Sequence, residues 1–257
     1  MNRDELTVFE GIVSVRALIE SAVSGINDRK IVKLLYDENK VREKQKEFAW
    51  LSHRAKDLGF LLQTVPTAEI DAVTEGKTHG GIAAFTRERS FPDASLLTKQ
   101  NGSFFVWMEG IEDPFNFGFS IRSLYACGAD ALLLSPRNWM SAAGTVCRSS
   151  AGASERMPMY TVSDPEGTVR NLKKEGFRIV CADLRDAVPL SGTELKKPLL
   201  LIIGGEKRGI SRSLLDLADM RVAIDYGRCF GEALSAASAA AIFGYEICKA
   251  NKDCLPQ

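Results

Sequence analysis

The sequence has little histidine and no cysteine pattern typical of a metal site. His53 and His79 are its two histidines, and neither lies in a motif with other potential ligands. The six cysteines are scattered and form no Cys-x-x-Cys pair. This pattern argues against a structural zinc site and against a disulfide framework. We therefore expect no metal and no disulfides, and we expect reduced, mostly buried thiols.

The sequence also lacks a long apolar run and an excess charge of either sign. No stretch approaches the roughly 20 apolar residues that span a bilayer, and the first five residues lack the apolar segment of a signal peptide. These features predict a cytoplasmic protein with no membrane association. Lys+Arg and Asp+Glu number 33 each, so the formal net charge is zero. Any nucleic acid would have to be bound through a local basic patch or through shape.

The first 88 residues alternate between the periods of helices and strands. Apolar residues recur at helical spacing from Val8 to Ile19 and from Phe48 to Leu58. Alternation of this kind predicts a small α/β domain over residues 1–88. The polar segment 89–101 contains Pro92 and shows no period, so we interpret it as a linker. Expected strands are 31–36, 61–65 and 80–85, and a short helix is expected at 68–73.

The remaining residues, 102–257, contain continuous apolar strands separated by helical stretches. Strands of this composition are typical of buried parallel sheets, so we predict a parallel sheet with helices on both faces. The expected strands are Phe104–Met108, Ala131–Leu134, Arg178–Ala182, Leu199–Ile203 and Arg221–Ile224. The expected helices are Asn116–Cys127, Ala142–Ala151, Gly167–Glu175, Ser211–Leu217 and Glu232–Lys249.

One motif follows the first strand of this second domain and opens a helix. Asn116 is predicted to cap that helix, and Arg122 lies in its second turn. Taken alone, the pattern Asn-x-Gly-x-x-x-Arg is more typical of a capped helix whose arginine pairs with a nearby carboxylate.

Two further motifs follow later strands. Gly204-Gly205-Glu206 and Gly209 form a glycine-rich turn at the carboxyl end of a strand, where open α/β sheets bind ligands. The turn is neither a dinucleotide fingerprint nor a phosphate-binding P-loop, which disfavours a nicotinamide-dependent enzyme. The segment from Ile224 leads into a helix start rich in small residues, a pattern that is also typical of tight helix packing.

In their order along the chain, these stretches resemble the motifs of the SpoU/TrmH RNA ribose 2′-O-methyltransferases of the SPOUT superfamily. The three matching patterns are Asn116-x-Gly118-x-x-x-Arg122, Gly204-x-Glu206-x-x-Gly209 and Ile224…Gly231-x-x-Leu234. Residues 150–155, Ser-Ala-Gly-Ala-Ser-Glu, are similar to that family's S-A-G-A-x-E stretch. Residues 78–84 resemble the join between its two domains, so the resemblance spans nearly the whole chain.

The resemblance implies an N-terminal α/β domain that binds the RNA substrate and a C-terminal α/β methyltransferase domain with a trefoil knot. It also implies S-adenosylmethionine as the cofactor, structured rRNA or tRNA as the substrate, and a homodimer. The residues that would contact the cofactor are Ile203, Gly204, Gly205, Gly209, Ile224, Ala233 and Leu234.

The resemblance assigns catalysis to Arg122, Asn116, Glu206 and Ser235. Arg122 would activate the ribose 2′-OH, either as a base or by orienting the target phosphate, since arginine is a poor base at its normal pKa. Asn116 would position Arg122 or the ribose, and Glu206 would anchor its loop or an arginine. RNA contacts are expected from Arg122, Glu155 and Arg148. A basic patch could form from Arg137, Arg148, Arg156, Arg208, Arg212 and Arg228.

The third motif departs from the family pattern. Where many members read S-L-N-x-S, this chain has Ala233-Leu234-Ser235-Ala236-Ala237, so that Ser235 is the direct polar substitute. Backbone contacts to a cofactor would survive this change, but side-chain hydrogen bonds would be weakened or replaced. The alternative interpretation is therefore an RNA- or cofactor-binding family member with lost or altered catalysis.

Overall fold

A computed structural model describes residues 6–76, 78–97, 102–135 and 142–251 of the chain. Its contacts divide the chain into two compact units. One comprises Met1–Ser90 and Asn138–Arg156, and the other comprises Phe91–Arg137 and Met157–Gln257. No helix among the described residues is long and apolar enough to cross a membrane.

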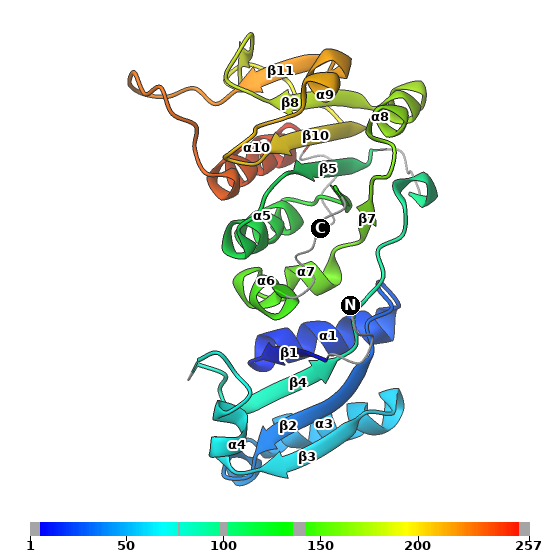
Figure 1. Cartoon of the computed structure of the whole chain (residues 1–257), viewed down its shortest axis with the longest axis vertical. Coiled ribbons are helices and arrows are strands. Elements are labelled where there is room, and N and C mark those ends of the chain that lie inside the picture. Colours follow the sequence, from blue (N-terminus) through cyan, green and yellow to red (C-terminus); the bar gives the residue numbers. More distant parts are fainter. Residues whose placement is uncertain (1–5, 77, 98–101, 136–141, 252–257) are drawn as a thin grey trace. The chain divides into compact units, whose positions relative to one another are not determined.

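The N-terminal unit is built on a four-stranded mixed sheet (Figure 1). The strands stand in the order β1-β4-β2-β3, with β4 antiparallel to both β1 and β2, and β2 parallel to β3. The strands are β1 (Thr7–Glu10), β2 (Ile31–Asp37), β3 (Leu61–Val65) and β4 (Ile82–Thr86). The helices are α1 (Ile12–Ser24), α2 (Lys40–Glu43), α3 (Gln45–Leu58), α4 (Thr67–Asp71), α6 (Ala143–Ser149) and α7 (Ala153–Arg156).

The alternation of side chains along the strands gives this sheet two apolar faces. On one face, Phe9, Leu34 and Ile82 pack with residues of α1 and α3. On the other face, Leu35 and Ala83 pack with Ile70 of α4. Both faces are therefore covered, as in a three-layer α/β domain.

Helices α6 and α7 are part of the N-terminal unit although they lie far along the sequence. Cys147 of α6 belongs to the same buried cluster as Phe9 and Leu34. Gly144 lies so close to β1 that a Cβ there would be 2.2 Å from the Val8 carbonyl oxygen. The contacts thus assign residues 138–156 to the N-terminal unit. These residues lie within 102–257, the range predicted for the second domain.

The C-terminal unit contains a seven-stranded sheet in the order β7-β6-β5-β10-β8-β11-β9, in which every pair of neighbours is parallel. Its strands are β5 (Phe104–Glu109), β6 (Ala131–Leu134), β7 (Met159–Thr161), β8 (Arg178–Ala182), β9 (Val188–Pro189), β10 (Leu199–Gly204) and β11 (Met220–Ala223). Its helices are the 3-10 turn η1 (Ala94–Leu96), α5 (Pro114–Ala126), α8 (Pro165–Lys174), α9 (Arg212–Leu217) and α10 (Ala236–Ala250).

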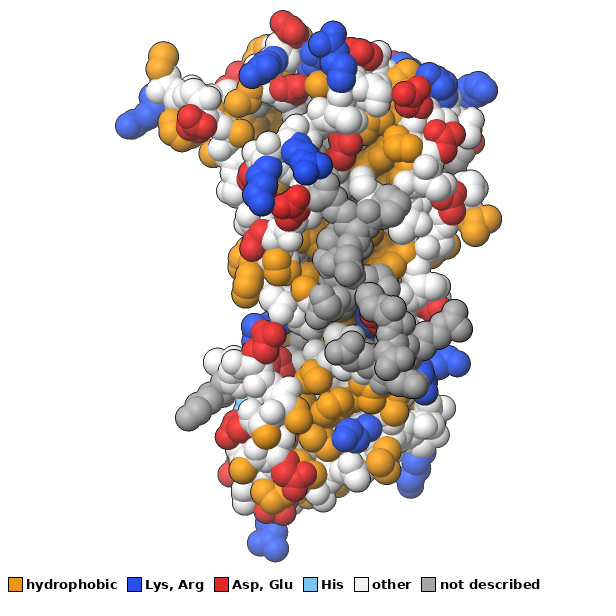
Figure 2. Space-filling view, in the orientation of Figure 1, with side chains coloured by type: hydrophobic (Ala, Val, Ile, Leu, Met, Phe, Trp, Pro, Cys, Tyr) orange, Lys and Arg blue, Asp and Glu red, His pale blue; other side chains and the backbone are white. Residues whose placement is uncertain are grey.

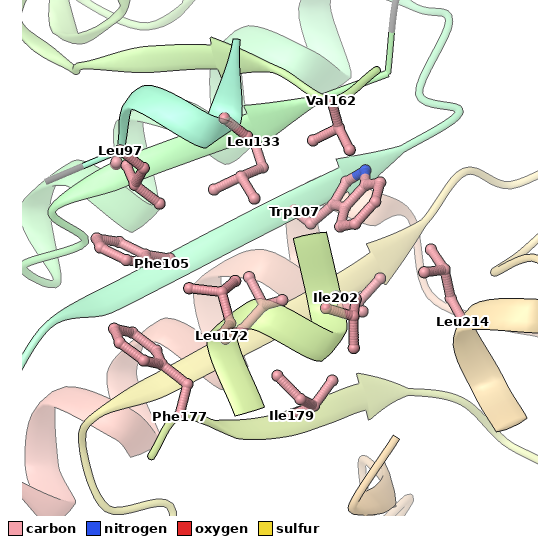
Figure 3. Packing of buried hydrophobic residues seen from close by; sticks show 14 of the residues in the cluster. Leu97, Phe105, Trp107, Leu133, Val162, Leu172, Phe177, Ile179, Ile202 and Leu214 are labelled. Atoms are coloured by element: carbon pink, nitrogen blue, oxygen red, sulfur yellow. The ribbon is translucent and has the colours of Figure 1, made fainter. Parts of the chain in front are cut away.

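Helix α5 packs against α10, and α8 packs against α9. The α8 and α9 side of the sheet holds a large apolar cluster in which Phe105 stacks on Phe177 with ring centroids 5.0 Å apart (Figure 3). Leu172 from α8 lies near the middle of this cluster, and Leu214 from α9 lies at its right-hand side in Figure 3. Leu97 also joins it, so part of the predicted linker packs with the C-terminal unit.

Three local predictions were wrong. Val8 was placed in a helix but lies in β1, because the run from Thr7 to Glu10 pairs with β4 before the helix begins. The last helix begins at Ala236 instead of Glu232, because Ser235 caps it. Asn116 is not the cap of α5. That position belongs to Asp113, whose Oδ1 accepts a hydrogen bond from the Asn116 backbone N–H at 2.7 Å.

The fold class predicted from the sequence, a small α/β domain followed by an α/β domain with a parallel sheet, is confirmed. The trefoil knot that the resemblance implies stays a prediction.

Candidate active site

A cavity of about 420 Å³ lies at the carboxyl ends of β8, β10 and β11. In a parallel sheet these ends share one edge, and open α/β sheets bind their ligands there. All seven residues predicted to contact a cofactor line this cavity: Ile203, Gly204, Gly205, Gly209, Ile224, Ala233 and Leu234. Glu206 lines it as well. The structure thus brings together two motifs that are separated in sequence.

The glycine turn after β10 is too tightly packed for side chains. A Cβ on Gly204 would lie 2.4 Å from the carbonyl carbon of Gly209, and one on Gly205 would lie 2.1 Å from the Gly110 carbonyl oxygen. The Gly205 N–H donates to the Glu109 carbonyl oxygen at 2.7 Å, which fastens the turn to the end of β5. Glycine is therefore required here for close approach of two backbone segments.

Glu206 joins the three motifs. Its Oε1 accepts a hydrogen bond from Nδ2 of Asn116 at 2.9 Å and another from the backbone N–H of Ala236 at 3.2 Å. The carboxylate therefore holds the start of α5 and the start of α10 against the turn after β10. The structure describes no arginine paired with Glu206, and its role in catalysis stays a prediction.

Arg122 lies on the exposed face of α5 and does not line the cavity. Among the residues that the structure describes, it has neither an ion pair nor a side-chain hydrogen bond. Phe115 and Phe119, both 46% exposed, lie on the same side of the helix, because they are seven and three positions from Arg122. The guanidinium is therefore available to a ligand or to another chain.

The third motif is held by two hydrogen-bonded anchors. At its start, the Ser191 N–H donates to Oδ2 of Asp225 at 2.7 Å, and this hydrogen bond lowers the pKa of the Asp225 carboxyl below its ordinary value. At its end, Ser235 Oγ accepts from the Ser238 N–H at 3.2 Å and also lies 3.1 Å from Ser238 Oγ. Ser235 therefore works as a helix cap in this structure.

Two residues predicted to contact RNA lie in the N-terminal unit and have ion-pair partners there. Glu155 is 2% exposed, and its Oε2 is 2.9 Å from Nε of Arg29 and 3.8 Å from Arg89. Arg148 pairs with Glu10. Their contact with RNA stays a prediction.

The remaining arginines of the predicted basic patch fall into three groups. Arg156 pairs with Glu20 and Arg212 with Asp216. Arg208 and Arg228 are exposed and have no ion-pair partner among the described residues. Arg137 lies outside the described residues.

Sequence reasoning missed the part of the cavity wall that follows β8. Asp183, Leu184 and Arg185 line the cavity there, and Tyr226 and Phe243 line it from the third motif and from α10. The position after β8 at the same sheet edge was the signal that could have identified Asp183. Beneath this wall, burial raises the pKa of the Cys181 thiol to about 12, so that it stays neutral.

Within the described part of the chain, no group of three or more His, Cys, Asp or Glu side chains could hold a metal ion. The polar groups at the cavity are carboxylates, guanidinium groups, backbone amides and hydroxyls.

Solved structures share this fold over nearly the whole chain. An AdoMet-bound rRNA methyltransferase from Sinorhizobium meliloti is 20% identical, with a TM-score of 0.78 over 98% of this chain and 88% of that one. The SpoU methyltransferase AviRb from Streptomyces viridochromogenes, in complex with AdoMet, is also 20% identical, with a TM-score of 0.76 over 98% of this chain and 95% of that one.

Sequence relatives also match over most of the chain. A Staphylococcus aureus protein assigned to the TrmH family of tRNA/rRNA methyltransferases is 28% identical over 248 residues, covering 94% of this chain and 96% of the relative. The Bacillus subtilis protein YacO, assigned to the same family, is 27% identical and covers 92% of this chain and 94% of its own length.

Family comparison covers both parts of the chain. Residues 10–92 match the RNA 2′-O ribose methyltransferase substrate-binding family. Residues 103–245, more than half of the chain, match the SpoU rRNA Methylase family and contain the glycine turn, the third motif and the cavity they line. The chain belongs to the SpoU rRNA methylase family.

Proposed function

We propose that this protein transfers a methyl group from S-adenosylmethionine to a ribose 2′-OH of rRNA or tRNA. The observation that carries the proposal is the convergence of all seven predicted cofactor residues on one cavity, in a chain of the SpoU family. In this proposal residues 1–88 bind the RNA substrate and residues 102–257 carry the reaction. Such an enzyme would work in the cytoplasm.

The cavity fits the cofactor in size and chemistry. Its volume of about 420 Å³ falls in the range of roughly 300–1,000 Å³ that is usual for small-molecule sites. Ile203, Ile224 and Leu234 offer apolar surface for an adenine ring, and the glycine turn exposes backbone groups for hydrogen bonds. When bound, S-adenosylmethionine supplies an electrophilic methyl group on a sulfonium.

The protein must then position the 2′-OH and help to remove its proton. Arg122 is the candidate, because it is exposed and has no partner among the described residues. It would act either as a base or by holding the neighbouring phosphate in a bidentate contact. Asn116 and Glu206 position the start of α5, on which Arg122 is carried. Ser235 contributes by fixing the start of α10.

A homodimer is part of the proposal. The exposed face of α5 presents Phe115, Phe119 and Tyr125 beside Arg122, and Tyr245 of α10 is 59% exposed. Burying these rings against a second copy would remove apolar surface from water and enclose Arg122.

Transfer of a radioactive methyl group from S-adenosylmethionine to purified rRNA and tRNA tests the function. We expect wild-type protein to methylate one of them, and the modified phosphodiester to resist alkaline hydrolysis because its 2′-OH is blocked. Arg122→Ala should lower kcat by roughly 10²- to 10⁴-fold, with cofactor affinity unchanged in calorimetric titration. Arg170→Ala, which removes an exposed arginine paired with Glu166 on α8, is the control and should behave as wild type.

The departure in the third motif gives the alternative a specific basis, because Ala233 and Ala237 cannot form side-chain hydrogen bonds. A protein that binds S-adenosylmethionine but methylates neither RNA class would support a binding role without turnover. A folded protein that binds no cofactor would contradict the proposal.

A further inference from the structure

The segment between β11 and α10 extends outward from the C-terminal unit (Figure 1). Two aromatic rings on this segment form a pair: the centroids of Tyr226 and Phe230 are 6.0 Å apart, with planes tilted by 56°. Tyr226 lines the cavity, whereas Phe230 does not line it and is 55% exposed. The pair therefore reaches from the wall of the cavity to the solvent.

Hydrogen bonds hold the two ends of the segment that carries this pair. Asp225, next to Tyr226, accepts a hydrogen bond from the Ser191 N–H, and Ala236 donates to Glu206 at the start of α10. Arg228 lies between the two aromatic residues in sequence and is exposed, without an ion-pair partner among the described residues. In Figure 2, apolar, basic and acidic side chains occur together on this protrusion.

A scattered exposed apolar residue is common and needs no explanation. Here, however, an exposed ring is paired with a second ring and accompanied by an available guanidinium, at the mouth of the cavity that the proposed function uses. Exposed aromatic faces next to cations are what proteins use to bind single-stranded nucleic acid, with bases on the rings and phosphates on the cations. A base inside a duplex has both faces covered by its neighbours and cannot stack in this way.

We propose that Phe230, supported by Tyr226, is a stacking platform for an unpaired base of the RNA substrate, and that Arg228 contacts an adjacent phosphate. The inference rests on the proposed function and deepens it. The methylated nucleotide then lies in or beside a loop, bulge or strand end. Its base is held by the ring while its ribose faces the cavity.

Binding of a short oligoribonucleotide that contains one 2-aminopurine tests the platform without requiring turnover. The full-length protein is titrated into the single strand and, separately, into the same strand paired with its complement. The variants are Phe230→Leu, which keeps an apolar side chain without a ring, and Phe230→Trp, which keeps a ring. Leu96→Ala, an exposed apolar position on η1, is the control.

Wild type and Phe230→Trp should quench 2-aminopurine in the single strand. Phe230→Leu should not, and its affinity should fall about 5- to 100-fold, the equivalent of losing one base–aromatic stack. Leu96→Ala should match wild type, and the duplex should bind more weakly and be insensitive to residue 230. Arg228→Gln should weaken binding to every sequence and reduce the slope of log affinity against log salt by about one.

Several results would overturn the inference. These are unchanged single-strand affinity in Phe230→Leu, a preference of wild type for the duplex, or failure of wild type to bind the single strand. A change in sedimentation coefficient in Phe230→Leu would instead assign the ring to a protein interface, which also overturns it. If single-strand binding depends on Phe230 but no RNA is methylated, the proposed function fails and the platform stands.

Discussion

Two stretches that resemble the same family's motifs have opposite environments in this molecule. Residues 150–155 are mostly buried, and the carboxylate of Glu155 lies between Arg29 and Arg89 in the N-terminal unit. The turn from Gly204 to Gly209 lies at the open edge of the parallel sheet and lines a cavity with the third motif. One stretch completes a domain core, and the other provides a surface for a ligand.

The difference shows that the sequence of a motif does not by itself distinguish a structural role from a ligand-binding role. In both stretches, small residues allow close backbone approach: Gly152 lies against Ala17 of α1, and Gly205 lies against Gly110. The two stretches differ in the surroundings of their polar groups. A buried carboxylate must be paired to offset the loss of water, whereas the hydrogen-bonding groups along a cavity are available to whatever enters it.

The largest expected effect comes from breaking the buried pair. Glu155→Gln leaves the positive charges of Arg29 and Arg89 without their carboxylate, and removing one partner of a buried ion pair costs about 3–5 kcal/mol. We expect a loss of this size in the free energy of unfolding, measured with urea. Cofactor affinity of the folded protein should not change.

Glu166→Gln is the matched control, because Glu166 forms an exposed pair with Arg170 on α8. Such pairs contribute roughly 0–1 kcal/mol, so its unfolding curve should nearly match wild type. Equal stability of the two variants would contradict the structural role assigned to Glu155.

Gly205→Ala is expected to lower the free energy of unfolding less than Glu155→Gln does, but to weaken cofactor binding more. The new Cβ would lie 2.1 Å from the Gly110 carbonyl oxygen, an atom that cannot rotate away, so the turn must shift. Overpacking of this kind costs about 1–3 kcal/mol. Because the shifted turn lines the cavity, we expect cofactor affinity to fall at least roughly tenfold, measured by calorimetry.

Gly227→Ala tests whether the effect comes from the collision, because a Cβ there would have no atom within 4 Å. Its cofactor affinity should equal that of wild type. If both alanine variants bind the cofactor normally, the turn does not form part of the binding site.

The smallest expected effect is a difference in alkylation rate between exposed and buried cysteine thiols. Burial raises the pKa of Cys147, in the N-terminal core, and of Cys181, in β8, to about 12, whereas Cys229 on the third motif is exposed. Because the thiolate is the reactive form, iodoacetamide at pH 8 should label Cys229 in the folded protein well before either buried cysteine. Peptide mapping by mass spectrometry separates them.

The same pKa shifts predict a direction with pH. In the range between the ordinary thiol pKa and about 12, the unfolded chain releases protons that the folded chain keeps, so stability falls as the pH rises. Above about pH 9, the rate of Cys147 labelling should therefore rise more steeply than the ionisation of the thiol predicts, because unfolding also exposes the thiol. Rapid labelling of Cys147 at pH 8 would contradict its burial.

Local sequence pattern predicted most of the fold. The strands Leu61–Val65, Ala131–Leu134 and Arg178–Ala182 have the predicted bounds, because each is a short apolar run with clear ends. The pattern failed where pairing decides the structure. Thr7–Glu10 and Met159–Thr161 are strands because neighbouring strands bind them, and their short sequences carry no clear period of two.

The sequence motifs led to one cavity, since the glycine turn and Leu234 both line it, and their contact with a cofactor stays a prediction. Side-chain partners were not predictable. The cap of α5 could have been placed correctly, because Asp113 is followed by Pro114, and proline is favoured at the first helical position. In contrast, the sequence could not show that the Asn116 amide contacts Glu206, because the two residues are 90 positions apart. Nor could it reveal that Glu155 and Arg148 are paired in the N-terminal unit, because those pairs join residues more than 100 positions apart.

The place of α6 and α7 in the N-terminal unit has a consequence for how the protein is made. Synthesis proceeds from the N-terminus, and domains generally fold as units while the chain emerges. Here the first unit takes Cys147 and Glu155 from the second half of the chain, after β5 and β6 have been made. On the ribosome, a nascent chain of 90 residues would carry Arg29 and Arg89 without their carboxylate, so its first unit is completed only once residue 156 has been added. The first unit therefore cannot be completed before β5 and β6 of the second unit have been synthesised.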